Sequence, residues 1–133
     1  MRVVFVWDEP ELTMLFTYAL QKSGYDVVSE CINDIEIGLK ACVENPPDLL
    51  IVGRSLHKKD DGFELSQRLR EVEGLPHFPI VAGYVDVWQK FEKAREKAEQ
   101  AGVDLCFGRV YDTGAIIKQI RELLDNRPAP AVS

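Results

Sequence analysis

The sequence predicts a single α/β domain in which a doubly wound, five-stranded parallel sheet is covered by helices on both faces. Short continuous apolar runs alternate with segments whose apolar residues recur at helical spacing, and this alternation occurs five times in 133 residues. A continuous apolar run is typical of a strand that is covered on both faces. Strands that alternate with helices through short connections favour right-handed crossovers and therefore a parallel sheet.

The first two strand–helix units show this pattern clearly. Val3–Val6 is a continuous apolar run, and a helical stripe follows it between Pro10, which suits a first turn, and Gly24, which suits the position past a helix end. The stripe consists of Leu12, Leu15, Phe16, Ala19 and Leu20. A second strand is predicted over Tyr25–Ser29, and Asn33 is predicted to cap the next helix. The inward-facing residues of that helix are Ile35, Leu39, Cys42 and Val43.

Three further units follow along the chain. Their predicted strands are Leu49–Val52, Ile80–Ala82 and Leu105–Phe107. The first of these is the most apolar, which predicts that it lies at the centre of the sheet. Asp86 and Asp112 are predicted to cap the last two helices. The apolar residues of the three predicted helices are Leu65, Leu69 and Val72, then Val87, Phe91, Ala94, Ala98 and Ala101, then Ile116, Ile120, Leu123 and Leu124.

The domain is expected to cover residues 1–126. The segment 127–133 has no apolar period and contains two prolines, as is typical of a linker or a frayed end. No apolar run reaches the roughly 18–20 residues that a membrane span needs. The first apolar run is also too short for a signal peptide, so the domain is expected in the cytoplasm, away from membranes.

Charge and cysteine content narrow the function classes. The formal net charge is −6 at pH 7, and an acidic surface is repelled by phosphate backbones, so no nucleic-acid partner is expected. Cys31, Cys42 and Cys106 are widely separated and form neither a CxxC pair nor a metal-ligand cluster. We therefore expect reduced thiols, with no metal and no other cofactor.

A candidate site follows from the expected fold. In an open parallel sheet, ligands bind beyond the carboxyl ends of the strands. The residues that follow the predicted strands and form the candidate site are Trp7, Asp8, Glu9, Gly53, Tyr84 and Arg109.

The chain resembles the receiver domains of two-component response regulators over residues 2–126. Five stretches carry the resemblance in matching order: VVFVWDEPEL, NPPDLLIVG, DGFELSQRLRE, FPIVAGY and AGVDLCFGRVYD. The resemblance implies the flavodoxin-like receiver fold of five strand–helix units. It also implies a carboxylate site, in which an acidic pair holds Mg²⁺ and an aspartate at the end of the third strand accepts a phosphoryl group.

The residues at the matching positions have changed. Gly53 stands at the nucleophile position and has no side chain that could form an acyl phosphate. Asp8 remains of the acidic pair, but its neighbour is Trp7. Tyr84 stands where a Thr or Ser is expected, and Arg109 replaces a lysine, which keeps the charge but not the geometry.

Two more matching positions differ. Val110 stands where receivers have a proline after a cis peptide bond, and a cis bond before another residue costs about 3 kcal/mol, so this loop is expected to take another path. Cys106 replaces the aromatic switch residue of the last strand. Together with the changed site, these differences predict a degenerate pseudo-receiver.

The altered residues are expected to hold the site in one state. Our hypothesis is that Arg109 pairs with Asp8, while Trp7 or Tyr84 packs into the space above Gly53. The alternative is that Arg109 points into solvent.

The predicted function is phosphorylation-independent binding of signalling proteins, without enzymatic activity, and a homodimer is one option. By family analogy, the fourth helix, fifth strand and fifth helix form the interface. The candidate interface residues are Trp88, Cys106, Val110 and Tyr111. Trp88 lies off the apolar stripe of its helix and either folds back on the core or forms an exposed aromatic anchor.

Two rival functions remain open. The first is an atypical receiver that accepts phosphate at a non-standard residue, such as Asp60 or Asp61, although this pair is better explained as a solvated loop before a helix N-terminus. The second is a small-molecule sensor, because flavodoxin-like proteins bind flavin in the same fold. The segment WDEPEL offers acids in place of a phosphate-binding loop, which argues against flavin.

Overall fold

Strands and helices alternate along the chain in the order that the apolar pattern predicts. The computed structural model describes residues 1–53, 61–83, 91–108 and 112–126. The strands are β1 (Arg2–Val6), β2 (Val28–Ile32), β3 (Leu49–Gly53), β4 (Ile80–Gly83) and β5 (Leu105–Phe107). The helices are α1 (Pro10–Lys22), α2 (Ile35–Glu44), α3 (Asp61–Arg70), α4 (Phe91–Gln100) and α5 (Thr113–Asn126).

The five strands of the described chain form one parallel sheet in the order β2-β1-β3-β4-β5. Every residue of β3 is buried, so the prediction that this strand lies at the centre is confirmed. The strand order reverses between β1 and β3, which is where sheets of this kind form ligand sites. The predicted fold class, a doubly wound five-stranded parallel sheet, is confirmed.

The second strand begins later than the apolar pattern predicts. The pattern predicts a strand over Tyr25–Ser29, but β2 runs from Val28 to Ile32. The backbone N–H of Val28 donates to the carbonyl oxygen of Met1 at 2.8 Å, and this bond aligns β2 with β1. The apolar signal is weak because β2 lies at an edge of the sheet, where four of its five residues are exposed.

The helix caps agree with the prediction at one of the two described positions. The α2 cap is Asp34 and not Asn33, since a carboxylate oxygen of Asp34 accepts the backbone N–H of Ile37 at 2.9 Å. Asp112 caps α5 as predicted, because its Oδ1 atom accepts a backbone N–H of the first turn at 3.2 Å. Asp86 lies outside the described residues.

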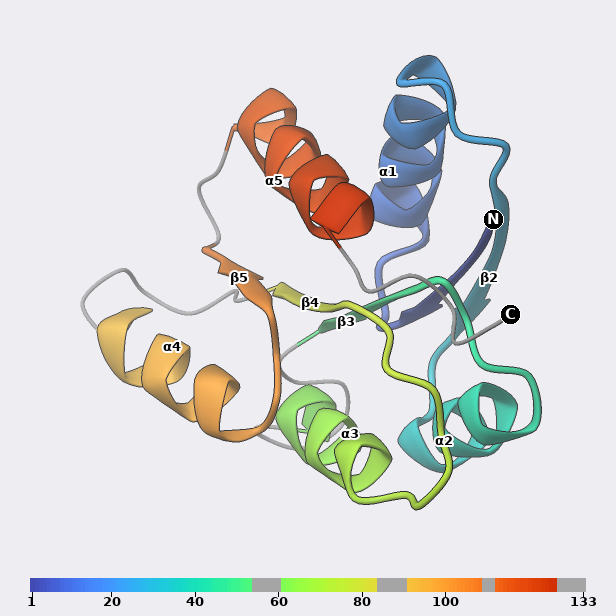
Figure 1. The fold of residues 1–133 in the computed structure, drawn as a ribbon. Helices are drawn as coiled ribbons and strands as arrows, with labels where there is room; N and C mark the ends of the chain where they lie inside the picture. The colour runs from blue at the N-terminus through green and yellow to red at the C-terminus, as the bar shows by residue number, and fades with distance from the viewer. Residues whose placement is uncertain (54–60, 84–90, 109–111, 127–133) are drawn as a thin grey trace.

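Helices cover both faces of the sheet (Figure 1). On one face, α1 and α5 enclose a core that includes Val3, Phe5, Phe16, Ile51 and Ile120. On the other face, α2, α3 and the end of α4 enclose a core that includes Val4, Val52, Leu65, Ile80 and Ala98. Leu15 and Val43, which were expected to face inward, are 42% and 40% exposed because they lie at the margins of their helix stripes.

The start of α3 lies against the end of β3. A Cβ atom at Gly62 would stand 1.8 Å from the carbonyl oxygen of Gly53 and 3.2 Å from Cγ2 of Val52. No side chain fits at such a distance from a backbone atom, so position 62 requires glycine. The contact holds the first turn of α3 at the carboxyl edge of the sheet.

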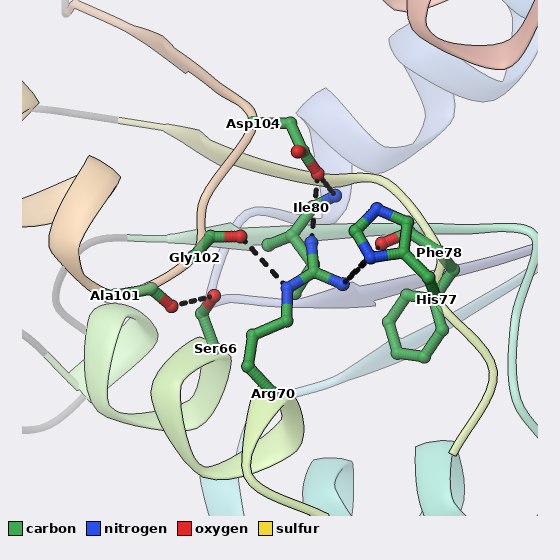
Figure 2. Close-up of polar contacts among 8 residues, drawn as sticks. All are labelled: Ser66, Arg70, His77, Phe78, Ile80, Ala101, Gly102 and Asp104. Carbon is green, nitrogen blue, oxygen red and sulfur yellow. Dashed lines mark hydrogen bonds and ion pairs between the residues drawn. The ribbon is translucent and has the colours of Figure 1, made fainter. Parts of the chain in front are cut away.

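Arg70, the last residue of α3, joins the segments that enter β4 and β5 (Figure 2). Its Nε donates to the carbonyl oxygen of Gly102 at 3.0 Å, and its Nη1 donates to that of Phe78 at 2.8 Å. Its Nη2 donates to Oδ2 of Asp104 at 2.9 Å. The same oxygen accepts the backbone N–H of Ile80 at 2.8 Å, so one guanidinium ties a helix end to two strand starts.

The environment of Arg70 is partly buried. Burial lowers the pKa of its guanidinium, and the neighbouring carboxylate of Asp104 acts in the opposite direction. One turn earlier in α3, the buried hydroxyl of Ser66 donates to the carbonyl oxygen of Ala101 at 2.7 Å. Both side chains therefore hold α3 against the turn that connects α4 to β5 (Figure 2).

Replacement of Gly62 by alanine is expected to lower the free energy of unfolding by about 1–3 kcal/mol, as overpacking does. The added methyl group must push α3 away from β3, because the atom that it meets belongs to the backbone. Urea unfolding followed by circular dichroism measures the change. Gly114→Ala is the matched control, since its Cβ would meet only Oδ1 of Asp112, at 3.3 Å. Equal stability of the two variants would contradict the close contact.

Replacement of Arg70 by alanine is expected to cost about 2–3 kcal/mol, because two carbonyl groups lose their donor and the carboxylate of Asp104 loses its cation. Arg68→Ala, two positions earlier in the same helix, is the control. Its guanidinium pairs with Glu36 at the surface, where removal of a pair changes stability little. Thermal unfolding compares the two variants. A similar melting temperature for both would contradict the claim that the hydrogen bonds of Arg70 stabilise the fold.

Candidate functional site

The carboxyl ends of the strands meet at one edge of the sheet. Of the predicted site residues, the structure describes Trp7, Asp8, Glu9 and Gly53. Tyr84 and Arg109 lie outside the described residues, so the pairing of Arg109 with Asp8 stays a prediction. Of the predicted interface residues, Trp88, Val110 and Tyr111 lie outside the described residues, and Cys106 lies in β5.

Trp7 is a core residue with a satisfied polar atom. Its side chain is 3% exposed, and its indole N–H donates to Oγ1 of Thr13 at 2.7 Å. The ring stacks on Phe5 with centroids 5.6 Å apart, and it lies 6.0 Å from the ring of Phe16. Phe16 lies 5.6 Å from Phe107. These four rings form an aromatic layer between the sheet and the helices α1 and α5.

The indole crosses the end of β3. Its Cζ3 atom lies 3.4 Å from the position that a Cβ atom would take at Gly83 in β4. Gly53 in β3 is aligned with Gly83, and β3 lies between β1 and β4. A ring that starts after β1 and reaches Gly83 therefore passes over Gly53. Phe107 bounds the same space from β5, with its Cζ atom 3.3 Å from the Gly83 Cβ position.

The two glycines make room for the indole. Leu49 and Ile51 of β3 pack into the same core as Trp7, so a side chain at position 53 would point into the aromatic layer. A Cβ atom at Gly83 would already be in tight contact with two rings. The end of the central strand thus carries an apolar ring and no carboxylate.

The acids beside Trp7 face solvent. Asp8 and Glu9 are both exposed, and the backbone carbonyl of Glu9 accepts the hydroxyl of Thr13 at 3.0 Å. Among the residues that the structure describes, no group of three His, Cys, Asp or Glu side chains is arranged to hold a metal ion. None of the described helices has the length and apolar character that crossing a bilayer requires.

Asp61 is buried, so the prediction that it lies in a solvated loop is wrong. It is the first residue of α3, where an acid is favoured, but only 6% of it is exposed. Its neighbour Gly62 lies close to the carbonyl oxygen of Gly53, so this turn packs on the sheet. Asp60 lies outside the described residues.

Thr13 is a site residue that the sequence interpretation missed. It is 8% exposed and lies three residues before Phe16 on the inward stripe of α1. A small polar residue on an apolar stripe near a tryptophan was the signal that could have identified it. Its Oγ1 atom also lies 3.5 Å from Sγ of Cys31, which lies 3.8 Å from the carbonyl oxygen of Trp7.

The described cysteines are free thiols, as predicted. Cys42 is fully buried, and burial raises the pKa of its thiol to about 11, so it stays protonated at neutral pH. Cys106 is half-buried in β5 and packs against the core beneath α4. It lines a groove of about 270 Å³ together with Arg95, Ala98, Glu99, Val103, Asp104, Leu105 and Gln119.

Replacement of Thr13 by valine is expected to destabilise the fold by about 1–3 kcal/mol, because the buried indole N–H of Trp7 loses its acceptor. Thr17→Val is the control, since the Thr17 hydroxyl lies in a more exposed place and donates to the backbone at 2.7 Å. Thermal unfolding and tryptophan emission in a Trp88→Phe background report the effect. An unchanged Trp7 emission, with stability equal to the control, would show that the bond to Thr13 is unimportant.

Comparison with known proteins gives two sequence relatives, and no family model matches the chain. The chain is 26% identical over 125 residues to the DNA-binding dual master transcriptional regulator RpaA of Synechocystis sp. This alignment covers 92% of the chain and 48% of that protein. It is 35% identical over 80 residues to the alkaline phosphatase synthesis transcriptional regulatory protein PhoP of Bacillus subtilis. This alignment covers 60% of the chain and 31% of that protein. The chain therefore spans about half or less of the length of these curated relatives.

Solved structures match over nearly the whole chain. The signal receiver domain of a signal transduction histidine kinase from Syntrophus aciditrophicus has a TM-score of 0.77 and 16% identity, and the match covers 99% of this chain and 96% of that one. Both curated relatives are named as transcriptional regulators, one of them as DNA-binding, so the predicted lack of nucleic-acid contact gains no support from them. The chain therefore has the fold of response-regulator receiver domains, and its sequence is similar to those of two transcriptional regulators.

Proposed function

We propose that this receiver domain transmits signals by binding partner proteins and does so without being phosphorylated. The observation that carries the proposal is Gly53 at the end of β3. An acyl phosphate forms when a carboxylate oxygen attacks the phosphorus atom and displaces the donor's leaving group. Glycine offers no such oxygen, so the fold has no nucleophile at the position where receivers carry theirs.

The packing around Gly53 supports the proposal. The Trp7 indole reaches Gly83 from the end of β1, across the strand that ends at Gly53, and it is buried and hydrogen-bonded to Thr13. Exposing a large apolar side chain costs about 1.5–3 kcal/mol. Breaking the buried hydrogen bond adds about 1–3 kcal/mol, so the space is closed under ordinary conditions.

The positions of the remaining acids argue against a substitute phosphoacceptor. Asp61 is buried beside the contact between Gly62 and Gly53, where a phosphoryl donor has no access. Asp8 is exposed, but Trp7 has replaced the second acid of the pair that would hold Mg²⁺ with it.

The proposal assigns partner binding to the surface of α4, β5 and α5. β5 is an edge strand, and the groove that Cys106 lines runs between the two helices. Signalling proteins or a second copy of the chain are the expected occupants. In this function the chain uses no catalytic residue, no cofactor and no nucleic-acid contact, residues 1–126 form the domain, and 127–133 form a linker.

Incubation with acetyl phosphate and Mg²⁺ is expected to leave the intact mass of the protein unchanged, because no carboxylate stands at position 53. Beryllofluoride with Mg²⁺ is expected to leave the Trp7 emission unchanged in a Trp88→Phe background. Intact-mass spectrometry and fluorescence titration are the measurements. A stoichiometric gain of one phosphoryl group would overturn the proposal.

A pair of variants separates the effect of the missing carboxylate at position 53 from the effect of the Trp7 indole that covers it. In Gly53→Asp the nucleophile is restored beneath an indole that still covers it, so little phosphoryl uptake is expected. In the double variant Trp7→Asp with Gly53→Asp, the acidic pair and the nucleophile are both restored, and uptake is expected to exceed that of the single variant. Equal uptake by the two variants would show that the indole is no barrier.

A further inference from the structure

β2 is an uncovered edge of the sheet. The strand order puts β2 and β5 at the two edges, and β2 is the longer, with five residues against three. No described helix or strand lies beyond its outer side (Figure 1). Natural edge strands are usually blocked by proline, lysine, a bulge or a cover. The β2 sequence VSECI has neither proline nor lysine.

The backbone of β2 has two residues that face outward. The N–H of Val28 donates to Met1, so the polar backbone groups of Val28 face β1. These groups alternate in direction along a strand, so those of Glu30 also face β1, and those of Ser29 and Cys31 point away from the sheet. Two donors and two acceptors at strand spacing fit the backbone of one more extended chain.

The elements that border β2 carry exposed apolar side chains. Val28 is 69% exposed, Met14 and Tyr18 of α1 are 73% and 58% exposed, and Ile37 of α2 is 60% exposed. Oγ1 of Thr17 lies 3.1 Å from Oγ of Ser29, so α1 directly adjoins the strand. An added strand would therefore find apolar surface for its side chains as well as backbone partners.

The charge along this edge selects a basic occupant. Asp26 precedes β2, Glu30 lies within it and Asp34 follows it. Arg2 lies 3.2 Å from Glu30 and neutralises its charge, so the acids that attract the occupant are Asp26 and Asp34. A second copy of the chain would bring its own acidic edge and a net charge of −6 against this one, whereas a lysine- or arginine-rich segment is attracted.

We propose that the outer edge of β2 binds an extended basic segment of a partner protein as a sixth strand of the sheet. Backbone hydrogen bonds with Ser29 and Cys31 would supply the pairing, and the acids beside the strand would select the positive charge. This site lies at the opposite edge from β5. Binding there does not depend on the Gly53 site, so a failure of this proposal and a failure of the proposed function can be told apart.

A capped six-residue peptide of alternating lysine and valine serves as the probe. Residue-resolved amide hydrogen exchange by NMR is expected to show fast exchange at Ser29 and Cys31 in the free protein. At saturating peptide their exchange should slow by at least about tenfold, because both N–H groups become hydrogen-bonded. The amide of Glu30, which faces β1 already, should change little. A peptide with glutamate in place of lysine should produce no protection.

Ser29→Pro tests the same contact from the protein side. Proline removes one outward N–H and leaves the bonds to β1 in place, and it is tolerated at an edge. The affinity for the lysine–valine peptide is expected to fall at least about tenfold. Circular dichroism checks that the variant is folded, and if it is not, a peptide methylated on alternate backbone nitrogens makes the equivalent test with the natural chain.

Four results would overturn the proposal. They are no saturable binding of the lysine–valine peptide, equal binding of the glutamate or methylated peptide, protection at residues away from β2, and a dimer of the chain that forms through β2 and excludes the peptide. Sedimentation velocity with and without the peptide detects the last of these.

Discussion

The packing of an indole ring beside two glycines is the contact on which the interior at the carboxyl ends of the central strands depends. Gly53 and Gly83 end neighbouring strands in register, and their missing side chains leave the space that Trp7 occupies. The ring is almost fully buried, and its single polar hydrogen is bonded to Thr13. The side of the sheet at the end of β3 therefore faces a close-packed aromatic layer, and charge is costly in such surroundings.

At the other end of the strands, polar contacts hold the segments that lead into β4 and β5. Arg70 and Ser66 join α3 to the segments that enter β4 and β5, with Asp104 as the shared carboxylate. The two edge strands of the sheet are β2 and β5. β5 lies beside a groove between two helices, and β2 presents bare backbone among acids.

Much of the fold could be predicted because each strand or helix has its own apolar period. β3 was identified as central because a strand covered on both faces must be apolar throughout. β2 was misplaced along the chain because an edge strand with four exposed residues has almost no such signal. Asp61 was judged solvated because the packing of its turn against the end of β3 joins residues that are distant in the sequence, and no local pattern records such a contact.

The amino-acid sequence by itself determined the alternation of strands and helices and the lack of a carboxylate at position 53, since both follow from residue type and spacing. It left open whether Trp7 or Tyr84 would cover Gly53, because both follow strands that end at the same edge. Only the tertiary structure brought the Trp7 indole across β3 and paired it with Thr13. The physical reason is that the direction of a side chain at a strand end depends on the neighbouring strands and on the helix packed above them.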